Sequence, residues 1–304
     1  MNPRIIERSV DWIKVFAPAK CNLFLAITGQ RPDGYHELST IVGKLSIGDT
    51  LEIHKTPDHS KINLNCPSYK DLENEKNLVF QAVQKWHQKT GENWGANILL
   101  NKEIPPMSGL GGGSSDAVSA LVALNELGRK KLSIKELIDL AGEIGSDCPS
   151  FFQDGLCLAQ GRGENIHPLN QKVAQNLIGQ KVLLFRPEIG FSTAEVYRKF
   201  SEIKKYSSKE WINKWLQDWQ NNQLAEDAFL FNDLENAVFL KHRYFSVLFH
   251  QIKTKFGLNS LMSGSGSCCF TLIPKNFDQI EDLKNEILSA WGDGTWVKPA
   301  EIIN

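Results

Sequence analysis

The stretch PPMSGLGGGSSDAV, residues 105–118, has the composition of a loop that binds phosphate. A strand-like segment, 95–105, leads into it, and apolar residues at helical spacing follow it. This order places unpaired backbone N–H groups and the positive end of a helix dipole around an anion, and serine hydroxyls add further donors. The residues that we predict to surround the phosphates are Pro106, Gly109, Gly111, Gly112, Gly113, Ser114 and Ser115.

The loop does not match the common nucleotide-binding motifs. It lacks the lysine of the GxxxxGK[ST] motif, and the segments around it do not alternate as the βαβ units of dinucleotide-binding folds do. A sharp turn with a purely structural role is therefore the alternative that the residues alone leave open.

Phosphoryl transfer needs more than a phosphate-binding loop. It requires a cation near the transferring group, a carboxylate near the acceptor hydroxyl and, in most enzymes, Mg²⁺. Lys20 lies in the apolar run APAKCN, where a lysine without a function is not expected, and Asp147 lies in the turn GSDCPSF. Because Asp147 directly precedes a predicted helix start at Cys148-Pro149, capping that helix is an equal alternative to catalysis.

The elements that must position these residues mix strands and helices without regular alternation, which is typical of the α+β class. We expect strands over 13–29, interrupted at Pro18, and two strands over 39–55 around a turn at Gly48-Asp49. The helices that we expect are 77–91, ended by Gly91, a capping-box helix from Ser133 to about Gly145, and a closing helix over 276–291. A shift in composition near residue 160 predicts a domain boundary there.

Aromatic residues occur in two notable places. Tyr35 and His36 follow the Pro-Asp-Gly turn of RPDGYHEL, for which an exposed turn without a partner is the simpler interpretation. Tryptophans at 211, 215 and 219 share one helical face within 207–231. They predict either a stripe that binds a partner or, as we favour, an amphipathic helix packed onto its own domain.

The composition excludes several classes of protein. The 304 residues carry a net charge of −1 and contain no apolar run near the length of a membrane span, so we expect neither a nucleic-acid nor a membrane partner. The N-terminal segment lacks the apolar core of a signal peptide, which predicts a cytoplasmic protein. The six cysteines have no metal-binding spacing and predict reduced, buried thiols.

Four segments together resemble the GHMP kinase superfamily, in order and at matching intervals over most of the chain. They are 18–38, 105–127, 145–152 and 261–270. The first is the most specific, because PAKCNLFL followed by RPDGYH is similar to the members that act on a cytidine diphosphate-linked alcohol. The resemblance implies a two-domain α+β fold with the active site in the cleft between the domains. Residues 1–160 would bind ATP and catalyse, and 161–304 would form the substrate side.

The resemblance also implies an activity. It is ATP-dependent phosphorylation of the 2-hydroxyl of a cytidine diphosphate-linked methylerythritol, within non-mevalonate isoprenoid synthesis, by a monomer or homodimer. Mg²⁺ would arrive with ATP instead of being held by protein side chains alone. The alternatives are a kinase of the same fold acting on homoserine or mevalonate, and a nucleotide sensor without catalysis.

Roles for single residues follow from the same resemblance. Asp147 would orient the acceptor hydroxyl, either as a general base or as an orienting carboxylate alone, and Lys20 would keep Asp147 ionised and stabilise the transferring charge. Substrate-binding roles fall on Asn22, Tyr35, His36, Tyr197, Gly264 and Gly266, and positions beside the adenine on Asn77 and Leu78. Asp116 stands where the family more often has a neutral residue, so a lysine or Mg²⁺ would have to offset its charge near the phosphates.

Overall fold

The computed structural model describes residues 4–59, 61–221 and 230–304, and the chain divides into two compact units. The first consists of the chain up to Ala19 with Ile47–Pro106 and Gly111–Asp154, and the second of Lys20–Ser46, Met107–Leu110 and everything from Gly155. The sequence places one boundary near residue 160. In the structure the chain changes units several times, and the last change falls at residues 154–155. The reason is that two long strands, β2 (Trp12–Gln30) and β3 (His36–Thr56), each carry residues of both units.

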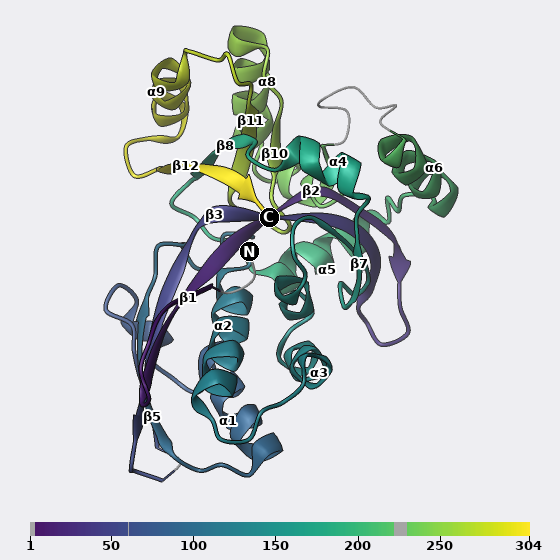
Figure 1. Ribbon diagram of the computed structural model, residues 1–304. Helices are drawn as coiled ribbons and strands as arrows, with labels where there is room; N and C mark the ends of the chain where they lie inside the picture. The colour runs from purple at the N-terminus through teal and green to yellow at the C-terminus, as the bar shows by residue number, and fades with distance from the viewer. Residues whose placement is uncertain (1–3, 60, 222–229) are drawn as a thin grey trace. The chain divides into compact units, whose positions relative to one another are not determined.

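The first unit packs helices against a small sheet (Figure 1). Strand β1 (Arg4–Arg8) pairs antiparallel with the start of β2, and the second half of β3 pairs antiparallel with β5 (Gly95–Asn101). Strand β4 (Ile62–Asn65) lies parallel to β5. The helices of this unit are η1 (Lys70–Leu72), α1 (Leu78–Thr90), α2 (Gly112–Leu127), α3 (Ile134–Ile144) and η2 (Cys148–Phe152).

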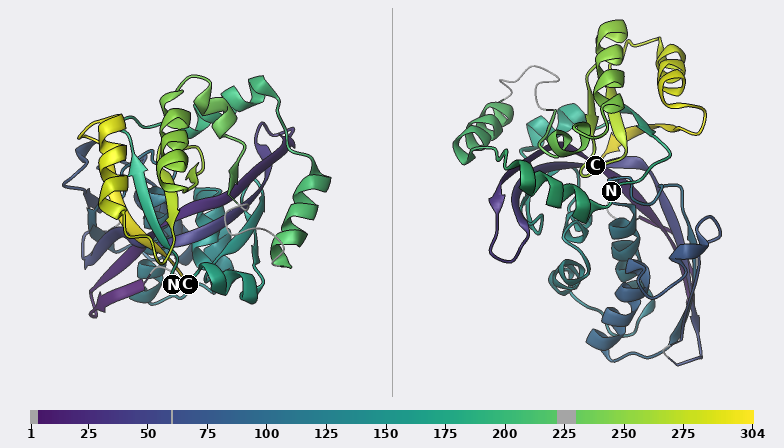
Figure 2. Two further views of the ribbon diagram at one scale, coloured as in Figure 1. Left: turned by 90° about the horizontal axis from the view of Figure 1, so that it is seen from above. Right: turned by 180° about the vertical axis from the view of Figure 1, so that it is seen from behind.

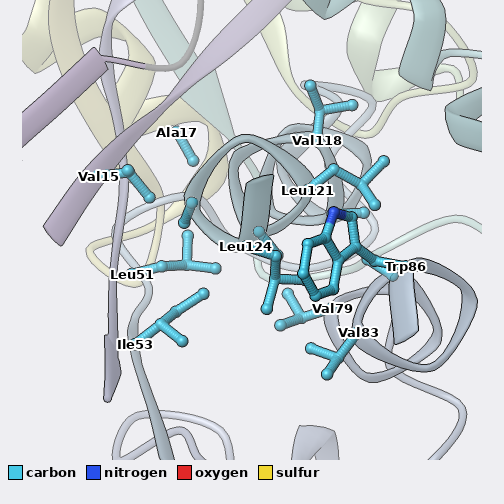
Figure 3. Close-up of a cluster of buried hydrophobic side chains, with 14 of the residues drawn as sticks. Val15, Ala17, Leu51, Ile53, Val79, Val83, Trp86, Val118, Leu121 and Leu124 are labelled. Atoms are coloured by element: carbon cyan, nitrogen blue, oxygen red, sulfur yellow. The ribbon is translucent and has the colours of Figure 1, made fainter. Parts of the chain in front are cut away.

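The helix boundaries of this unit follow from local capping. Asn77 accepts a hydrogen bond from the N–H of Val79 at the start of α1, and Gly91 ends that helix in a left-handed conformation. Ser133 and Glu136 form the expected capping box of α3, so both predicted helices are confirmed. The core forms where strand side chains such as Leu51 meet Trp86 of α1 and neighbouring residues of α2 (Figure 3).

The two long strands differ from the prediction. Strand β2 is not interrupted at Pro18, and β3 does not turn at Gly48-Asp49. A β-carbon on Gly48 would lie 2.1 Å from the carbonyl oxygen of Ala17 and 2.7 Å from Cα of Pro18. Gly48 is thus required because the backbone of β2 passes directly against it, and the same glycine makes a turn look probable when only the sequence is considered.

The second unit is built on an antiparallel sheet in which β12 (Trp296–Ile303), β8 (Lys181–Arg186), β11 (Cys269–Ile273) and β10 (Ser260–Met262) follow one another. The first half of β3 pairs with β12 and with β6 (Cys157–Gly161). The remaining strands are β7 (Asn165–Pro168), which pairs with β6, and β9 (Phe231–Asn232), which lies parallel to β2. The helix expected at the end of the chain does not close the fold, because β12 follows it.

Helices of the second unit cover this sheet. Helices α8 (Tyr244–Phe256) and α9 (Ile280–Trp291) lie side by side in Figure 2, and residues of both join the core under strands β8 and β11. The others are α4 (Gln171–Leu177), α5 (Thr193–Ile203), α6 (Lys209–Gln220) and α7 (Glu235–Phe239). No helix among the described residues is both long and apolar enough to cross a lipid bilayer.

The tryptophan helix packs onto its own unit, as favoured from the sequence. Trp215 is buried with its ring centroid 3.9 Å from that of Phe24, and Trp219 is also buried. Trp211 is 40% exposed but still lies 5.0 Å from the ring of Phe231. Part of the predicted stretch, 222–229, lies outside the described residues. The six cysteines are free and buried, as predicted.

Candidate active site

The glycine-rich stretch leads into α2 of the first unit. Strand β5 ends at Asn101, earlier than the predicted 105, and an irregular segment containing Pro106 continues to Gly111, the N-cap of α2. Gly111 has a left-handed φ of 68° and offers no side-chain cap, and the first turn of the helix contains no acidic residue. The N-terminus of this 16-residue helix is therefore suited to an anion.

The residues around the start of α2 differ in exposure and in their hydrogen-bond partners. Gly113 is exposed, and Leu78 lies next to it, because a β-carbon on Gly113 would be 3.8 Å from Leu78 Cδ1. Asn77 caps α1 and donates to the carbonyl of Leu72 at 3.0 Å. Ser114 is half-buried and hydrogen-bonds the thiol of Cys148.

Ser115 differs from the sequence expectation of a hydroxyl directed at phosphate. Its side chain is fully buried, and its Oγ has no hydrogen-bond partner among the described residues. A helix with 3.6 residues per turn directs neighbouring side chains about 100° apart, so two consecutive serines do not face the same way. Of the two hydroxyls, that of Ser114 is the one near the surface.

Asp147 stands at the N-cap position of η2 in the first unit. Its side chain makes no capping hydrogen bond to that helix, and the residue is exposed. Its backbone carbonyl accepts from the N–H of Ser150 at 3.3 Å and from the Ser150 hydroxyl at 2.7 Å. The backbone is thus fixed while the carboxylate is not used as a cap, which removes the main argument for the capping alternative.

Lys20 is held in the second unit by neutral acceptors. Its buried ammonium donates to Asn22 Oδ1 at 2.5 Å and to the carbonyl oxygen of Gly109 at 2.9 Å. The amide of Asn22 in turn donates to the hydroxyl of Thr40 at 2.8 Å, which donates to the carbonyl of Phe24 at 2.6 Å. This chain of hydrogen bonds fixes the direction of the lysine side chain.

The loop between β10 and β11 lies against Gly109 and Lys20. A β-carbon on Gly109 would lie 2.1 Å from the carbonyl oxygen of Ser263, so only glycine fits there, and Ser263 Oγ donates to the carbonyl of Gly109 at 3.0 Å. A β-carbon on Gly264 would lie 3.0 Å from Asn22 Oδ1 and 3.4 Å from Lys20 Nζ. Gly264 therefore faces the lysine, as the resemblance implies for a residue of the site floor.

The backbone of Gly266 lies against the same loop, since a β-carbon on Gly109 would be 2.9 Å from Gly266 N and 3.0 Å from its carbonyl oxygen. A β-carbon on Gly266 itself would point toward Met262 and Phe191, in the core of the unit. Three residues that support the site were not predicted from the sequence, namely Thr40, Ser263 and Asn232. The side-chain amide of Asn232 donates to the carbonyls of Met262 and Gly264 at 2.7 and 2.8 Å. Ser263 lies within the motif segment 261–270, whereas Thr40 and Asn232 carry no motif and become recognisable only through their distant partners.

The aromatic residues of the RPDGYHEL turn meet α5 of the second unit. His36 is buried, not exposed as the simpler interpretation has it. Its Nε2 lies 2.8 Å from the hydroxyl of Ser201, and its ring centroid lies 5.0 Å from that of the half-buried Tyr197. Burial lowers the pKa of His36, which favours the neutral imidazole. Tyr35 remains 53% exposed.

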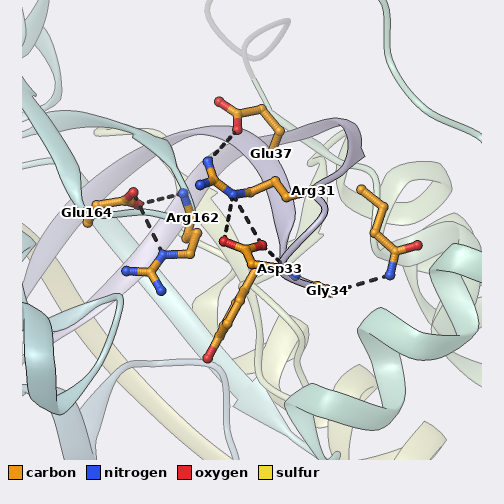
Figure 4. A network of polar contacts seen from close by, with 8 residues as sticks. Arg31, Asp33, Gly34, Glu37, Arg162 and Glu164 are labelled. Carbon is orange, nitrogen blue, oxygen red and sulfur yellow. Dashed lines mark hydrogen bonds and ion pairs between the residues drawn. The ribbon is translucent and has the colours of Figure 1, made fainter.

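Charged residues brace the turn that presents Tyr35 (Figure 4). Arg31 forms ion pairs with Asp33 at 3.2 Å and with Glu37 at 3.0 Å. Arg162, anchored through its backbone N–H to Glu164, places its guanidinium 5.0 Å from the centre of the Tyr35 ring. The predicted turn is confirmed, with the N–H of Gly34 bonded to the carbonyl of Arg31.

Family comparisons agree with this geometry. Residues 77–155 match the GHMP kinases N terminal domain and 212–293 match the GHMP kinases C terminal, together more than half of the chain. The chain belongs to the GHMP kinase family, so it is a kinase for which ATP is the phosphoryl donor. The four motif segments predicted membership of this family, and the sequence predicted the α+β class; both predictions are confirmed.

Particular relatives share one name. A 4-diphosphocytidyl-2-C-methyl-D-erythritol kinase from Methylacidiphilum infernorum (isolate V4) is 36% identical over 296 residues, which cover 96% of this chain and 98% of the relative. The chloroplastic enzyme of that name from Oryza sativa subsp. japonica is 37% identical over 227 residues, which cover 75% of this chain but only 55% of the longer plant protein. A crystal structure of 4-(cytidine 5'-diphospho)-2C-methyl-D-erythritol kinase aligns with a TM-score of 0.73 at 31% identity, over 95% of this chain and 99% of that one.

Proposed function

We propose that the protein transfers the terminal phosphoryl group of ATP to the 2-hydroxyl of 4-diphosphocytidyl-2-C-methyl-D-erythritol, in non-mevalonate isoprenoid synthesis. The family makes the protein a kinase, and the relatives named above act on this substrate by name. The observation that carries the choice of substrate is the pairing of His36 with Tyr197, next to the exposed ring of Tyr35. Aromatic side chains of this kind suit a nucleobase, which can stack on them. Homoserine and mevalonate contain no ring that would stack in this way.

A cytosine ring has two apolar faces and a polar edge, so stacking combined with a few hydrogen bonds recognises it efficiently. Tyr35 and Tyr197 supply the aromatic faces, and His36 supplies ring nitrogens whose orientation is set by Ser201. The lowered pKa of His36 supports a neutral, hydrogen-bonding imidazole in this role. The guanidinium of Arg162 stabilises Tyr35 from its ring face.

The phosphates of ATP would bind at the start of α2, where the Gly111–Ser114 segment offers backbone N–H groups without a side-chain cap. Asn77 and Leu78 would lie beside the adenine. The described residues contain no group of three His, Cys, Asp or Glu side chains able to hold a metal ion. Mg²⁺, which neutralises phosphate charge when bound, would arrive with ATP and be held mainly by phosphate oxygens and water.

Asp147 would accept a hydrogen bond from the substrate hydroxyl and orient that oxygen toward the phosphorus atom. The ammonium of Lys20, directed by Asn22 and Gly109, would stabilise the charge on the transferring group. Because phosphoryl transfer passes through a loose transition state, orientation contributes more than early removal of the proton. The rigid hydrogen-bond chain behind Lys20 supports such a positioning role.

The experiment that tests this function measures ATP consumption by the purified protein with Mg²⁺. The three acceptors to compare are 4-diphosphocytidyl-2-C-methyl-D-erythritol, homoserine and mevalonate. We expect turnover only with the cytidine-linked acceptor. Turnover with homoserine or mevalonate instead would overturn the choice of substrate, and saturable ATP binding without turnover of any acceptor would favour a nucleotide sensor.

A further inference from the structure

Three charged side chains are buried together beside the start of α2. The ammonium of Lys102, just past the end of β5, lies 2.5 Å from Asp49 Oδ2 on β3 and 2.7 Å from Asp116 Oδ2 on α2. The three side chains are 3%, 0% and 3% exposed, respectively. We refer to Lys102, Asp49 and Asp116 as the buried triad. Its members are separated by as many as 67 positions in the sequence, yet one cation joins all three elements.

Two members of the buried triad, Asp49 and Lys102, have a second contact that locates them. Asp49 Oδ1 accepts the backbone N–H groups of Glu103 at 2.7 Å and Ile104 at 2.9 Å, which fixes the segment that leaves β5. A β-carbon on Gly112, the first residue of α2, would lie 3.1 Å from Lys102 Nζ. The lysine therefore lies directly under the first turn of the helix, while its ion pair with Asp116 holds the second turn.

We propose that the buried triad is a positioning device for the first turn of α2, and that Asp116 and Lys102 thereby set the affinity for ATP. This inference rests on the proposed binding of phosphate at that turn. Anion binding by backbone N–H groups depends on their direction, and a displacement of about 1 Å can cost as much as 10²-fold in an enzyme. A helix start without a side-chain cap needs another support, and the buried triad provides it.

The surroundings argue for positioning over a gain in overall stability. Two carboxylates share one ammonium, and Asp116 Oδ1 has no hydrogen-bond partner among the described residues. Burial raises the pKa of Asp116 to about 8, against the opposing effect of Lys102. Buried ion pairs of this kind are often no more stabilising than apolar residues of equal volume, and their best-attested benefit is a fixed geometry.

Asp116→Asn, assayed at pH 9, is the variant that tests this role, because it keeps the shape of the side chain and an acceptor for Lys102 but removes the charge that the Asp116 carboxyl, with a pKa of about 8, carries at that pH. The matched control is Asp139→Asn, on an exposed position of α3 in the same unit. We expect Asp116→Asn to raise the KM for ATP about tenfold, with kcat and the KM of the acceptor changed less than about twofold. The control should leave all three constants unchanged.

Hydrogen exchange of the ligand-free protein tests the positioning itself. We expect faster exchange at the amide of Ser115, which donates to the carbonyl of Gly111 at 2.9 Å and closes the first turn, in Asp116→Asn, and no change at the C-terminal end of α2, Leu124–Leu127. Unchanged exchange at the first turn would overturn the proposal, whatever the acceptor of the kinase proves to be. Faster exchange with an unaltered KM for ATP would also overturn it, and would count against phosphate binding at this turn.

A pH profile of the wild-type protein covers the case in which Asp116→Asn does not fold. The charged and titratable groups that face Asp116 are Lys102, Asp49 and the thiol of Cys66. Burial raises the pKa of Asp116 to about 8, so its ionisation falls between pH 7 and 9, whereas the pKa values of Lys102 and Cys66 are raised above their ordinary values. Its ionisation strengthens the pair with Lys102, so the KM for ATP should fall as pH rises. A KM that is constant or rises over this range would overturn the proposal.

Discussion

Lys20 and Asp147 are supported by the fold in opposite ways. Lys20 is buried and donates to Asn22 and Gly109, so its position depends on a network that continues through Thr40 to the carbonyl of Phe24. Asp147 is exposed, and its backbone is fixed through Ser150. A buried cation serves to stabilise charge, whereas an exposed carboxylate on a fixed backbone can meet a substrate hydroxyl with little rearrangement.

The carboxylate of Asp147 should therefore be needed for turnover but not for ATP binding. We expect Asp147→Ala to lower kcat by about 10²- to 10⁴-fold, the range typical of a lost acid–base group, and to leave the dissociation constant of ATP within about threefold. Steady-state kinetics and calorimetry with ATP measure the two quantities. Asp139→Ala is the control for removing an exposed carboxylate from the same unit. Retention of most of the activity by Asp147→Ala would remove this residue from the mechanism.

His36 and Tyr35 allow a second comparison of single residues. His36 is buried against Tyr197 and bonded to Ser201, whereas Tyr35 is half-exposed. We expect His36→Ala to raise the KM for the cytidine-linked acceptor about tenfold or more, because the edge of the base loses a partner, and Tyr35→Phe to change it less than about twofold. The KM for ATP is the internal control. Equal, small effects of the two substitutions would place the cytosine elsewhere.

Strand β3 shows how one glycine determines the path of an element. The strand continues without a break through Gly48, where β2 leaves no room for a side chain. Asp49, the next residue, is buried and holds the segment after β5, and for this reason it does not serve as a turn residue. The close approach of β2 at Gly48 thus also brings the Asp49 carboxylate of the buried triad into place.

Alanine substitutions at two glycines of β3 test this account. Gly48→Ala should destabilise the protein by about 1–3 kcal/mol or more, because its β-carbon would overlap backbone atoms that cannot move aside. Gly43→Ala, in the same strand, should change stability by less than about 1 kcal/mol, since its nearest neighbours are side-chain atoms at 3.6–3.9 Å. Thermal unfolding of both variants and the wild type measures the difference. Similar melting temperatures for the two variants would contradict the proposed crowding at Gly48.

Elements with local signals could be predicted from the sequence, and those with distant partners could not. The caps at Asn77 and Ser133 lie within three residues of the groups that they bond, so the starts of α1 and α3 were evident. Strand β12 carries no strong local signal and exists through its pairing with β8 and β3. The uninterrupted course of β3 depends in the same way on neighbours that the sequence does not reveal.

The same distinction applies to the candidate site. Motif residues such as Lys20, Asn22 and Gly264 were identified, and the structure brings these three together. The contact between His36 and Ser201 joins residues 165 positions apart, and Thr40 and Asn232 act only through what they hold. Local sequence patterns could therefore indicate the residues that carry the chemistry. The residues that hold them in position could be identified only from the structure.

At the scale of the whole molecule, neither unit is a continuous segment. The second unit takes Lys20–Ser46 from the N-terminal part of the chain. Within this unit, β3 pairs with β6 through residues 38–42 and with β12 at Leu45 and Lys44, and β9 pairs with β2 at Phe24 and Leu25. A fragment that begins at Gly155 would lack the partner strand of β6 and β9 and would expose an edge of β12.

We therefore expect residues 155–304 not to fold as an isolated fragment. The unpaired strand edges and the lost contacts of Phe24 with α6 remove both hydrogen bonds and apolar packing that the unit needs. Near-UV circular dichroism and limited proteolysis, with the intact chain as control, measure this directly. Mixing with the fragment 1–154, which carries β2 and β3, should restore the signal. A cooperative thermal transition of the isolated 155–304 fragment, with the near-UV spectrum of a packed core, would show instead that residues 20–46 are dispensable for that unit.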